Sequence, residues 1–565
     1  MRLPALLTIA VVTTLLGIGN RPPPDQCRLT LTLVDSEQSD TLSGLVRILD
    51  DKGRRLELPE LLDRGQGLPD DSPSHQWSVL TESRTLSVPC TQITITAISG
   101  LETETASSQI DLRNKATARV TLRLKRFHDS SRQNDYSANT HLHLQKLSRA
   151  ESDRYLVEVP QGDDLDVLFV SYLERAIADR TYITNAYTTD DLNRLSRMGH
   201  VLLGNGEEHR HNLAGFGQGY GHVMLLNIKQ LIQPVSIGPG IMKTGTDGLP
   251  VQRGIDQARR DGGTIVWCHN NWGLENIPNM ATGRIDAQNI FDGGTHGSYR
   301  DSYYQYLNAG FRVPFSTGTD WFMYDFSRVY TRVPGKLTVQ NWLKSLSAGR
   351  GYITNGPLME FSVDKQQPGA TLERRGPASV TVRGTVRGRA DFQRLELISN
   401  GRVVGTAASR PVDGHFEAQL TQQLELQTAS WLALRTPPPP TPSKPGAASA
   451  FPTNALGRHV FSHTSPVFVH MGGRIPFQLQ AAEKLLQTVQ QNRDSIDHNA
   501  LFADDQERSR VLQVYTAAAQ SLRQHIRRQR ETTTSSRRSR SETRLTDRSG
   551  RVAAVHAAGE RTRNR

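Results

Sequence analysis

The stretch Asn-Thr-His-Leu-His-Leu at residues 139–144 places two histidines two positions apart. On a β-strand, residues i and i+2 point to the same face, so His141 and His143 would converge while the leucines pack on the other side. Neutral imidazole is the commonest side-chain metal ligand, and such a pair is typical of half a metal site. Because the same spacing also occurs by coincidence on exposed strands, the rest of the chain must show whether this pair belongs to a metal site.

Other residues of metal-binding type stand at the ends of short apolar runs. They are Glu207 and Glu208 after HVLLGNG, His222 before VMLLNI, His269 after TIVWC, and Asp320 after VPFSTGT. All are nitrogen or oxygen donors, which divalent zinc, manganese and iron accept. Each residue alone is more often structural, but in parallel α/β folds the strand ends of one face assemble into sites. With the stretch that holds His141 and His143, these make five segments, and together they predict a metal site. Neighbouring residues on a strand point to opposite faces, so only one of Glu207 and Glu208 can face it.

The alternation of elements predicts the organisation of the chain. A length of 565 residues favours about three domains. Residues 27–126 alternate apolar and polar residues between turn formers, which predicts a β-sandwich of Ig-like or carboxypeptidase-regulatory type. Residues 135–360 alternate short apolar strands with helical segments, which predicts an α/β domain. We further expect a second β-sandwich over 361–470 with a Pro-rich insert at 436–449, and a helical hairpin over 476–530.

The two ends of the chain carry targeting and charge signals. Residues 1–20 have one early Arg and an apolar run, which predicts a signal peptide or an uncleaved anchor, and therefore an exported protein that is periplasmic, cell-surface or secreted. Export would allow Cys27 and Cys90 to pair, although the sequence does not fix that pairing. The net charge is +11, and residues 521–565 alone hold thirteen arginines against four acidic residues, a net of +9. We expect a disordered basic tail over 531–565 that could contact an anionic surface.

The motifs HLH, GEE, GH, CH and GTD occur in this order within residues 135–470. The set resembles the PHP (polymerase and histidinol phosphatase) superfamily of metal-dependent hydrolases. The stretches SAGRGYITNGPLMEFSVD and SHTSPVFV look like its carbaryl-hydrolase (CehA/McbA) branch. The resemblance implies an α/β fold in which a distorted seven-stranded β/α barrel, flanked by the β-sandwich domains, binds metals at the C-terminal ends of its strands.

The resemblance also implies a role for each ligand. The opening pair is His141 and His143, the bridging carboxylate is Glu208, the ligands of a second metal are His222 and His269, and the closing ligand of the first metal is Asp320. Three positions depart from the family pattern. Asn139 replaces an Asp, Ser171-Tyr172-Leu173 replaces Thr-Asp-His, and Trp321-Phe322 follows Asp320 in place of Ser-His. The missing ligands belong to a third metal, so we expect two divalent metal ions (Zn, Mn or Fe) bridged by Glu208.

Two metals a few ångströms apart can hold a bridging hydroxide, and so we expect hydrolysis of an ester, amide, carbamate or phosphoester bond, with Glu208 and Asp320 as catalytic residues. The expected substrate is a small molecule or the end of a polymer, and no specific nucleic acid is expected. An inert exported binding protein that keeps the barrel is the alternative, and nucleic-acid binding through the basic tail is a third hypothesis.

Residues next to the proposed ligands carry further hypotheses. Cys268 is expected to point to the opposite face of its strand from His269. His209 and His211 would either shuttle protons or lie on a surface loop. Trp272, Trp321 and Phe322 would either shape an apolar substrate pocket or belong to the core.

Overall fold

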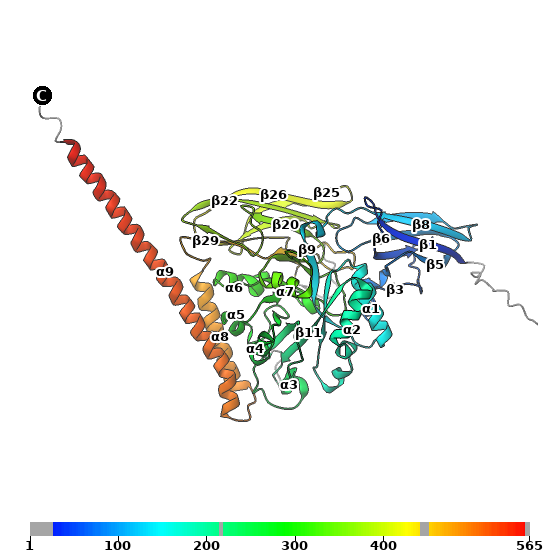
Figure 1. The fold of residues 1–565 in the computed structure, drawn as a ribbon, viewed down its shortest axis with the longest axis horizontal. Helices are drawn as coiled ribbons and strands as arrows, with labels where there is room; N and C mark the ends of the chain where they lie inside the picture. Colours follow the sequence, from blue (N-terminus) through cyan, green and yellow to red (C-terminus); the bar gives the residue numbers. More distant parts are fainter. Residues whose placement is uncertain (1–25, 214–218, 441–450, 560–565) are drawn as a thin grey trace, which may run out of the picture.

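The structure, a computed structural model, describes residues 26–213, 219–440 and 451–559, with side chains up to residue 532 in the last helix. The expected signal peptide at 1–20 lies outside the described residues, as does most of the Pro-rich insert. Strands of the N-terminal region lie at one end of the molecule, a large sheet with helices around it forms the centre, and a long C-terminal helix projects from the other end (Figure 1). Among the described residues, no helix has both the length and the apolar character needed to span a membrane.

The N-terminal strands form two small sheets around one core. One sheet holds β1 (Gln26–Asp35), β5 (Arg84–Pro89) and β8 (Thr117–Leu124); the other holds β2 (Gly44–Leu49), β3 (Leu62–Asp63), β4 (Ser78–Leu80), β6 (Gln92–Ile98) and β7 (Ala106–Asp111). Alternate residues such as Leu29, Leu31, Ile93 and Ile95 are fully buried between them. A disulfide joins Cys27 to Cys90 and so links β1 to the turn before β6.

Seventeen strands form one curled sheet that closes on itself. They are β9 (Asp135–His143), β10 (Val167–Tyr172), β11 (Leu202–His211), β12 (Gly221–Leu226), β13 (Ser236–Ile237), β14 (Thr264–Trp267), β15 (Ala287–Asn289), β16 (Phe315–Ser316), β17 (Asp320–Trp321), β18 (Arg328–Arg332), β19 (Gly351–Thr354), β21 (Thr371–Arg374), β23 (Arg394–Ser399), β24 (Arg402–Ala408), β27 (Ser430–Arg435), β28 (Ser462–Thr464) and β29 (Val467–Met471). A separate four-stranded sheet contains β20 (Leu358–Val363), β22 (Ala378–Gly388), β25 (Arg410–Val412) and β26 (His415–Leu426).

The expectation of an α/β fold with a seven-stranded β/α barrel is therefore wrong, because the described residues form mostly β-sheet. The strands β9, β10 and β11 are parallel neighbours, as a β/α repeat requires. However, β12 runs antiparallel to both β11 and β14, and β18 runs antiparallel to both β9 and β19. In addition, β19 pairs with β28, so strands of the region 361–470 continue the same sheet instead of forming only a flanking sandwich. The number of strands came from the resemblance to the PHP superfamily, and periodicity could not correct it, because periodicity locates strands but not their partners.

The helices connect and cover these strands. They are α1 (Arg149–Gly162), α2 (Thr189–Gly199), α3 (Pro239–Met242), α4 (Gln252–Arg260), α5 (Asn276–Ala281), α6 (Gln305–Asn308) and α7 (Val339–Ser347). The start of α1 is fixed by a capping box in which the Ser148 hydroxyl accepts from the Glu151 amide, while the Glu151 carboxylate accepts from the Ser148 amide. A second box, formed by Thr188 and Asp191, fixes the start of α2.

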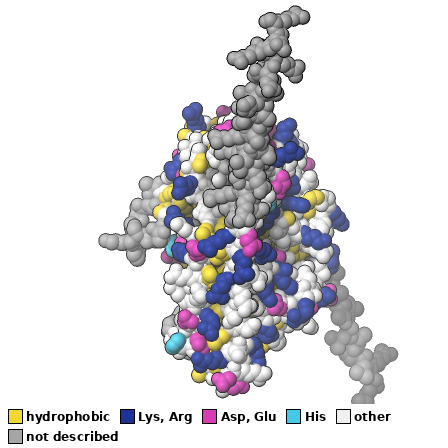
Figure 2. All heavy atoms as spheres, turned by 90° about the vertical axis from the view of Figure 1, so that its left-hand side faces the viewer, with side chains coloured by type: hydrophobic (Ala, Val, Ile, Leu, Met, Phe, Trp, Pro, Cys, Tyr) yellow, Lys and Arg dark blue, Asp and Glu magenta, His cyan; other side chains and the backbone are white. Residues whose placement is uncertain are grey.

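Two helices end the chain. α8 (Leu479–Asn499) packs on α6, and α9 (Asp505–Gly559) packs on α8 and α5 before it leaves the body (Figure 1). The structure continues α9 through most of the segment expected to be a disordered tail. Residues 531–549 contain no Gly or Pro and are rich in Arg, a good helix former, so nothing there stops the helix. On this side of the molecule, Lys and Arg side chains are scattered among uncharged ones (Figure 2).

Candidate metal centre

The first group of metal-ligand residues is built on β9 and its parallel neighbour β17. All of Ser137–His143 is buried, and His141 and His143 lie on the same face of β9 with their Nε2 atoms 3.0 Å apart. The register of β17 places Asp320 opposite Leu142. The Asp320 carboxylate therefore lies beside both imidazoles, with Oδ1 at 3.4 Å from His141 Nε2 and 3.7 Å from His143 Nε2.

Glu208 on β11 completes this group and also joins a second one. Its Oε2 atom lies 3.2 Å from His143 Nε2 and 3.9 Å from His141 Nε2. Its other oxygen, Oε1, lies 3.2 Å from His222 Nδ1 and 3.6 Å from His269 Nε2. The two oxygens of one buried carboxylate thus face two different sets of ligands. These clusters of His, Glu and Asp could hold a metal ion.

Two atoms at the centre of the site are buried without a satisfied hydrogen bond. Glu208 Oε1 and His222 Nδ1 face each other, yet neither makes a well-formed hydrogen bond within the described part of the chain. An unsatisfied buried carboxylate oxygen is costly, and a cation between the two atoms would remove that cost. Burial raises the pKa of Glu208, but Arg210 and the surrounding imidazoles outweigh it and hold this pKa well below its usual range. The residues present therefore fit a metal cation.

Asp292, which the sequence reasoning missed, supports one imidazole of each cluster from behind. Its Oδ2 atom lies 3.0 Å from His141 Nδ1, and its Oδ1 atom lies 3.3 Å from His269 Nδ1. The backbone amide of His269 also donates to Oδ1 at 3.0 Å. Such contacts fix the tautomer so that Nε2 is free to bind a metal. Burial raises the pKa of Asp292, but the neighbouring imidazoles hold it well below its usual range.

Backbone groups and backbone conformation position two further ligands, His143 and Asp320. The Nδ1 atom of His143 contacts the carbonyl oxygen of Ser171 on β10 at 2.8 Å, which leaves its Nε2 free toward Glu208. Asp320 has a left-handed backbone with φ of 62°, which is uncommon for a residue other than glycine. Gly293 must remain small, because a Cβ there would lie 2.7 Å from Asp320 Oδ2. The loop after β15 thus passes close to the Asp320 carboxylate.

The strand alternation of β11 separates the two adjacent glutamates. Glu208 faces the clusters, whereas Glu207 points to the other side, where its Oε1 atom contacts His209 Nδ1 at 2.8 Å and its Oε2 atom accepts from the Ile232 amide. His211 lies on that side as well, with Nε2 at 2.8 Å from Asp247 Oδ1. Both histidines are buried, so neither lies on a surface loop and neither reaches the site.

Cys268 does not point away from the site as expected. Its sulfur lies near His141 and Asp292, in a group that could also hold a metal. The expectation assumed continued strand alternation, but β14 ends at Trp267, and His269 and Asn270 have φ of 55° and 63°. Positive φ values turn the chain, so the rule that neighbours point to opposite faces fails at this position.

Two tryptophans and one arginine contact the proposed metal ligands. The ring of Trp272 packs edge-on against His222 at 4.7 Å between centroids, and the ring of Trp321 lies 5.4 Å from His143. Phe322, by contrast, is buried against Tyr155 and belongs to the core. Arg210 shares the face of β11 with Glu208 and donates to Glu208 Oε2 at 3.3 Å. Its Nε has no partner among the described residues, so it retains a donor for a further oxygen.

No family model and no curated protein matches this chain. Among solved structures, the chain has 8% identity to Bacteroides uniformis beta-glucuronidase 3, with a TM-score of 0.15, over 80% of this chain and 64% of that one. Parabacteroides merdae beta-glucuronidase gives the same identity and TM-score, over 76% of this chain and 60% of that one. The chain thus spans less than two thirds of either structure, and a TM-score this low shows no common fold.

Proposed function

We propose that this chain is an exported metal-dependent hydrolase that holds two divalent ions and cleaves an ester, amide, carbamate or phosphoester bond. The observation that carries the proposal is the position of Glu208, whose two buried oxygens face two separate groups of imidazoles. The order of the motifs that resemble the PHP superfamily supports the same assignment. A bound cation would also account for the buried carboxylate oxygen that lacks a hydrogen-bond partner among the described residues.

In this proposal, one ion is held by His141, His143, Glu208 and Asp320, and the other by Glu208, His222 and His269. The nitrogen and oxygen donors fit zinc, manganese or iron. When bound, such ions would supply a water molecule of lowered pKa and polarise the substrate oxygen.

The chain's own residues position the reactants. Asp320 and His269 have side chains 12% and 11% exposed, so the substrate approaches from their side. Arg210 donates to Glu208 Oε2 and so holds this carboxylate in place, and Asp292 keeps two imidazoles in the tautomer that binds a metal.

The test compares Glu208→Gln with Glu207→Gln, which is a matched control because the two residues are adjacent, buried and identical in type. Metal content is measured by elemental analysis, and activity is measured on chromogenic esters, carbamates and phosphoesters with added Mn²⁺ or Zn²⁺. We expect two ions per chain in the wild type and in Glu207→Gln, and the loss of both ions and of activity in Glu208→Gln. Circular dichroism confirms that each variant is folded.

Three results would contradict the proposal. If Glu208→Gln keeps both ions and its activity, the bridging assignment is wrong. If the wild type binds three ions tightly, the assignment of a missing third site is wrong. If the wild type binds metal but hydrolyses nothing in the panel, an inert metal-containing binding protein is the better description.

Export is a separate part of the proposal. The Cys27–Cys90 disulfide supports it, because disulfides persist in oxidising compartments. Cell fractionation with an antibody to the body of the protein tests this part. Full-length protein in the cytoplasm with free thiols at both positions would contradict it.

A further inference from the structure

A large cavity lies at the opposite end of β9 from the metal centre. It has a volume of about 950 Å³ and is bounded by β18 and β19 on one side and by β20 and β22 on the other. Asp135 at the start of β9 lines it, whereas His141 belongs to the metal clusters. Six residues of extended strand separate the two by roughly 20 Å. The cavity is therefore a separate site, and its volume is within the range that binds small molecules.

The cavity carries an excess of positive charge. Both lining carboxylates are neutralised: Asp135 by Arg332 at 2.7 Å, and Glu360 by Arg387 at 3.0 Å. Arg350, Lys365 and Arg383 also line the cavity and have no ion-pair partner among the described residues. Arg312 lines the cavity as well and donates to Gly369 and Thr371 instead of to a carboxylate. Four cations without a carboxylate partner around one concave surface attract anions, because the protein walls focus their field into the cavity.

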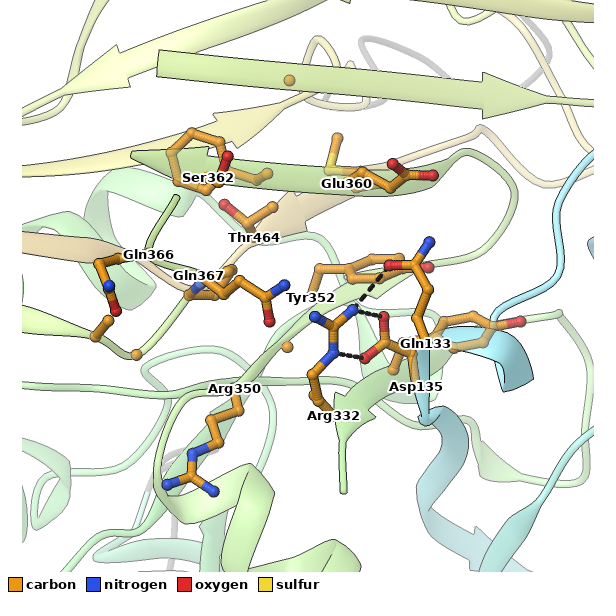
Figure 3. A pocket seen from close by; sticks show the side chains of 18 of the residues that line it. Gln133, Asp135, Arg332, Arg350, Tyr352, Glu360, Ser362, Gln366, Gln367 and Thr464 are labelled. Atoms are coloured by element: carbon orange, nitrogen blue, oxygen red, sulfur yellow. Dashed lines mark hydrogen bonds and ion pairs between the residues drawn. The ribbon is translucent and has the colours of Figure 1, made fainter. Parts of the chain in front are cut away.

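Neutral hydrogen-bonding side chains, among them Gln366, Gln367 and Tyr352, also line the cavity. Arg332 is bound to Asp135 and Gln133 on one side of the cavity, and Arg350, Gln366 and Gln367 lie at the other (Figure 3). Tyr352 forms part of the floor and stacks on Tyr330 with 5.2 Å between ring centroids. Tyr352 is 5% exposed, and in the described part of the molecule its hydroxyl makes no well-formed hydrogen bond, with the Met359 backbone as its nearest partner. A buried phenol without a well-formed hydrogen bond at the wall of a polar cavity is a group that a ligand hydroxyl would satisfy.

We propose that this cavity binds a saccharide that carries a carboxylate or a phosphate. The anionic group pairs with Arg350, Lys365 and Arg383, and the sugar hydroxyls bond to the side-chain amides and to Tyr352. The proposal does not rest on the hydrolase activity, because none of these residues belongs to the metal clusters.

The test is calorimetric titration of the full chain with glucuronate, glucose 6-phosphate, glucose and adenosine monophosphate. Because anions also bind metal ions, the titrations are performed with chelator present and repeated in Glu208→Gln. We expect one site for an acidic sugar, and no measurable binding of glucose. Comparing the carboxylate with the phosphate decides which anionic group the site prefers.

Arg350→Gln should weaken binding of the acidic sugar about 10- to 100-fold, which is the usual value of a charge-assisted hydrogen bond. Tyr352→Phe should weaken it less, by the loss of one neutral hydrogen bond. The matched control is Arg402→Gln, an exposed arginine on β24 outside the cavity, which should change nothing. Unchanged affinity in Arg350→Gln, equal binding of glucose, tighter binding of the nucleotide, or no binding of either acidic sugar would each overturn the proposal.

Discussion

Replacing Asp292 with Asn should selectively weaken the binding of one of the two proposed metal ions. The amide oxygen of Asn must face the His269 backbone N–H, whose direction is fixed, so the amide NH₂ takes the place of Oδ2 next to His141 Nδ1. His141 can accept from this NH₂ only if its proton moves to Nε2, which is the atom that faces Glu208 and Asp320. The metal ligand is then blocked in the cluster that contains His141.

The expected loss of metal affinity follows from the role of carboxylates that hydrogen-bond to a metal-binding histidine. Their loss typically weakens metal binding by about 10- to 100-fold, or roughly 1.4–2.7 kcal/mol. The Asn289 side-chain amide also donates to Oδ2, but His141 is the only proposed ligand that contacts this oxygen. Binding of the ion in the His141 cluster should therefore weaken by this factor, while binding of the ion at His222 and His269 should weaken much less. Competition with a fluorescent chelator resolves the two dissociation constants.

The matched control is Asp325→Asn. Asp325 is equally buried and accepts from Ser327 and Asn355, but it contacts no proposed ligand. It should leave both dissociation constants unchanged. Equal weakening of both ions in Asp292→Asn, or selective loss of the other ion, would refute the tautomer argument.

Three other outcomes are expected. His222→Ala should lower the metal content from two ions to one, and a content of zero or two would contradict the division into two clusters. Burial raises the pKa of Glu275 to about 7, so the protonated form is favoured in the native state. The free energy of unfolding should therefore fall by roughly 3 kcal/mol as the pH rises from about 4.5 to 7, relative to Glu275→Gln; urea titrations that show a constant difference would count against it. Cys27→Ser opens the loop that the disulfide closes across a separation of 63 residues, and this should reduce the free energy of unfolding by about 4 kcal/mol. Thermal melts that match the wild type would contradict this expectation.

The local geometry of the site follows from short-range rules. Alternation along β11 is enough to put Glu207 and Glu208 on opposite faces, and the structure places them so. The same rule failed for Cys268, because the strand had already ended and the backbone at His269 turns to positive φ. Alternation is informative only as far as the strand continues, and the sequence does not mark that end sharply.

Asp292 shows what sequence pattern alone does not provide. It follows the apolar residues Ile290 and Phe291 at the end of a short strand, which is the same signal that identified the other ligands. Its next residues are two glycines, typical of an ordinary turn, so the pattern gave no reason to prefer it. Its role depends on contacts with residues 151 and 23 positions away. The extent of the sheet is likewise a matter of long-range pairing, which periodicity does not encode.

The pairing of β19 with β28 has a consequence for how the chain can be divided. Their hydrogen bonds join Tyr352, Ile353 and Thr354 to Ser462–Thr464, across more than a hundred residues of intervening sequence. A polypeptide cut after residue 360 would keep every proposed metal ligand but would expose the unpaired edge of β19. Exposed edges of this kind recruit other chains, so such a fragment should self-associate. The C-terminal strand β28 thus covers the edge of β19, and residues up to 360, which hold the proposed metal ligands, do not form an autonomous folding unit.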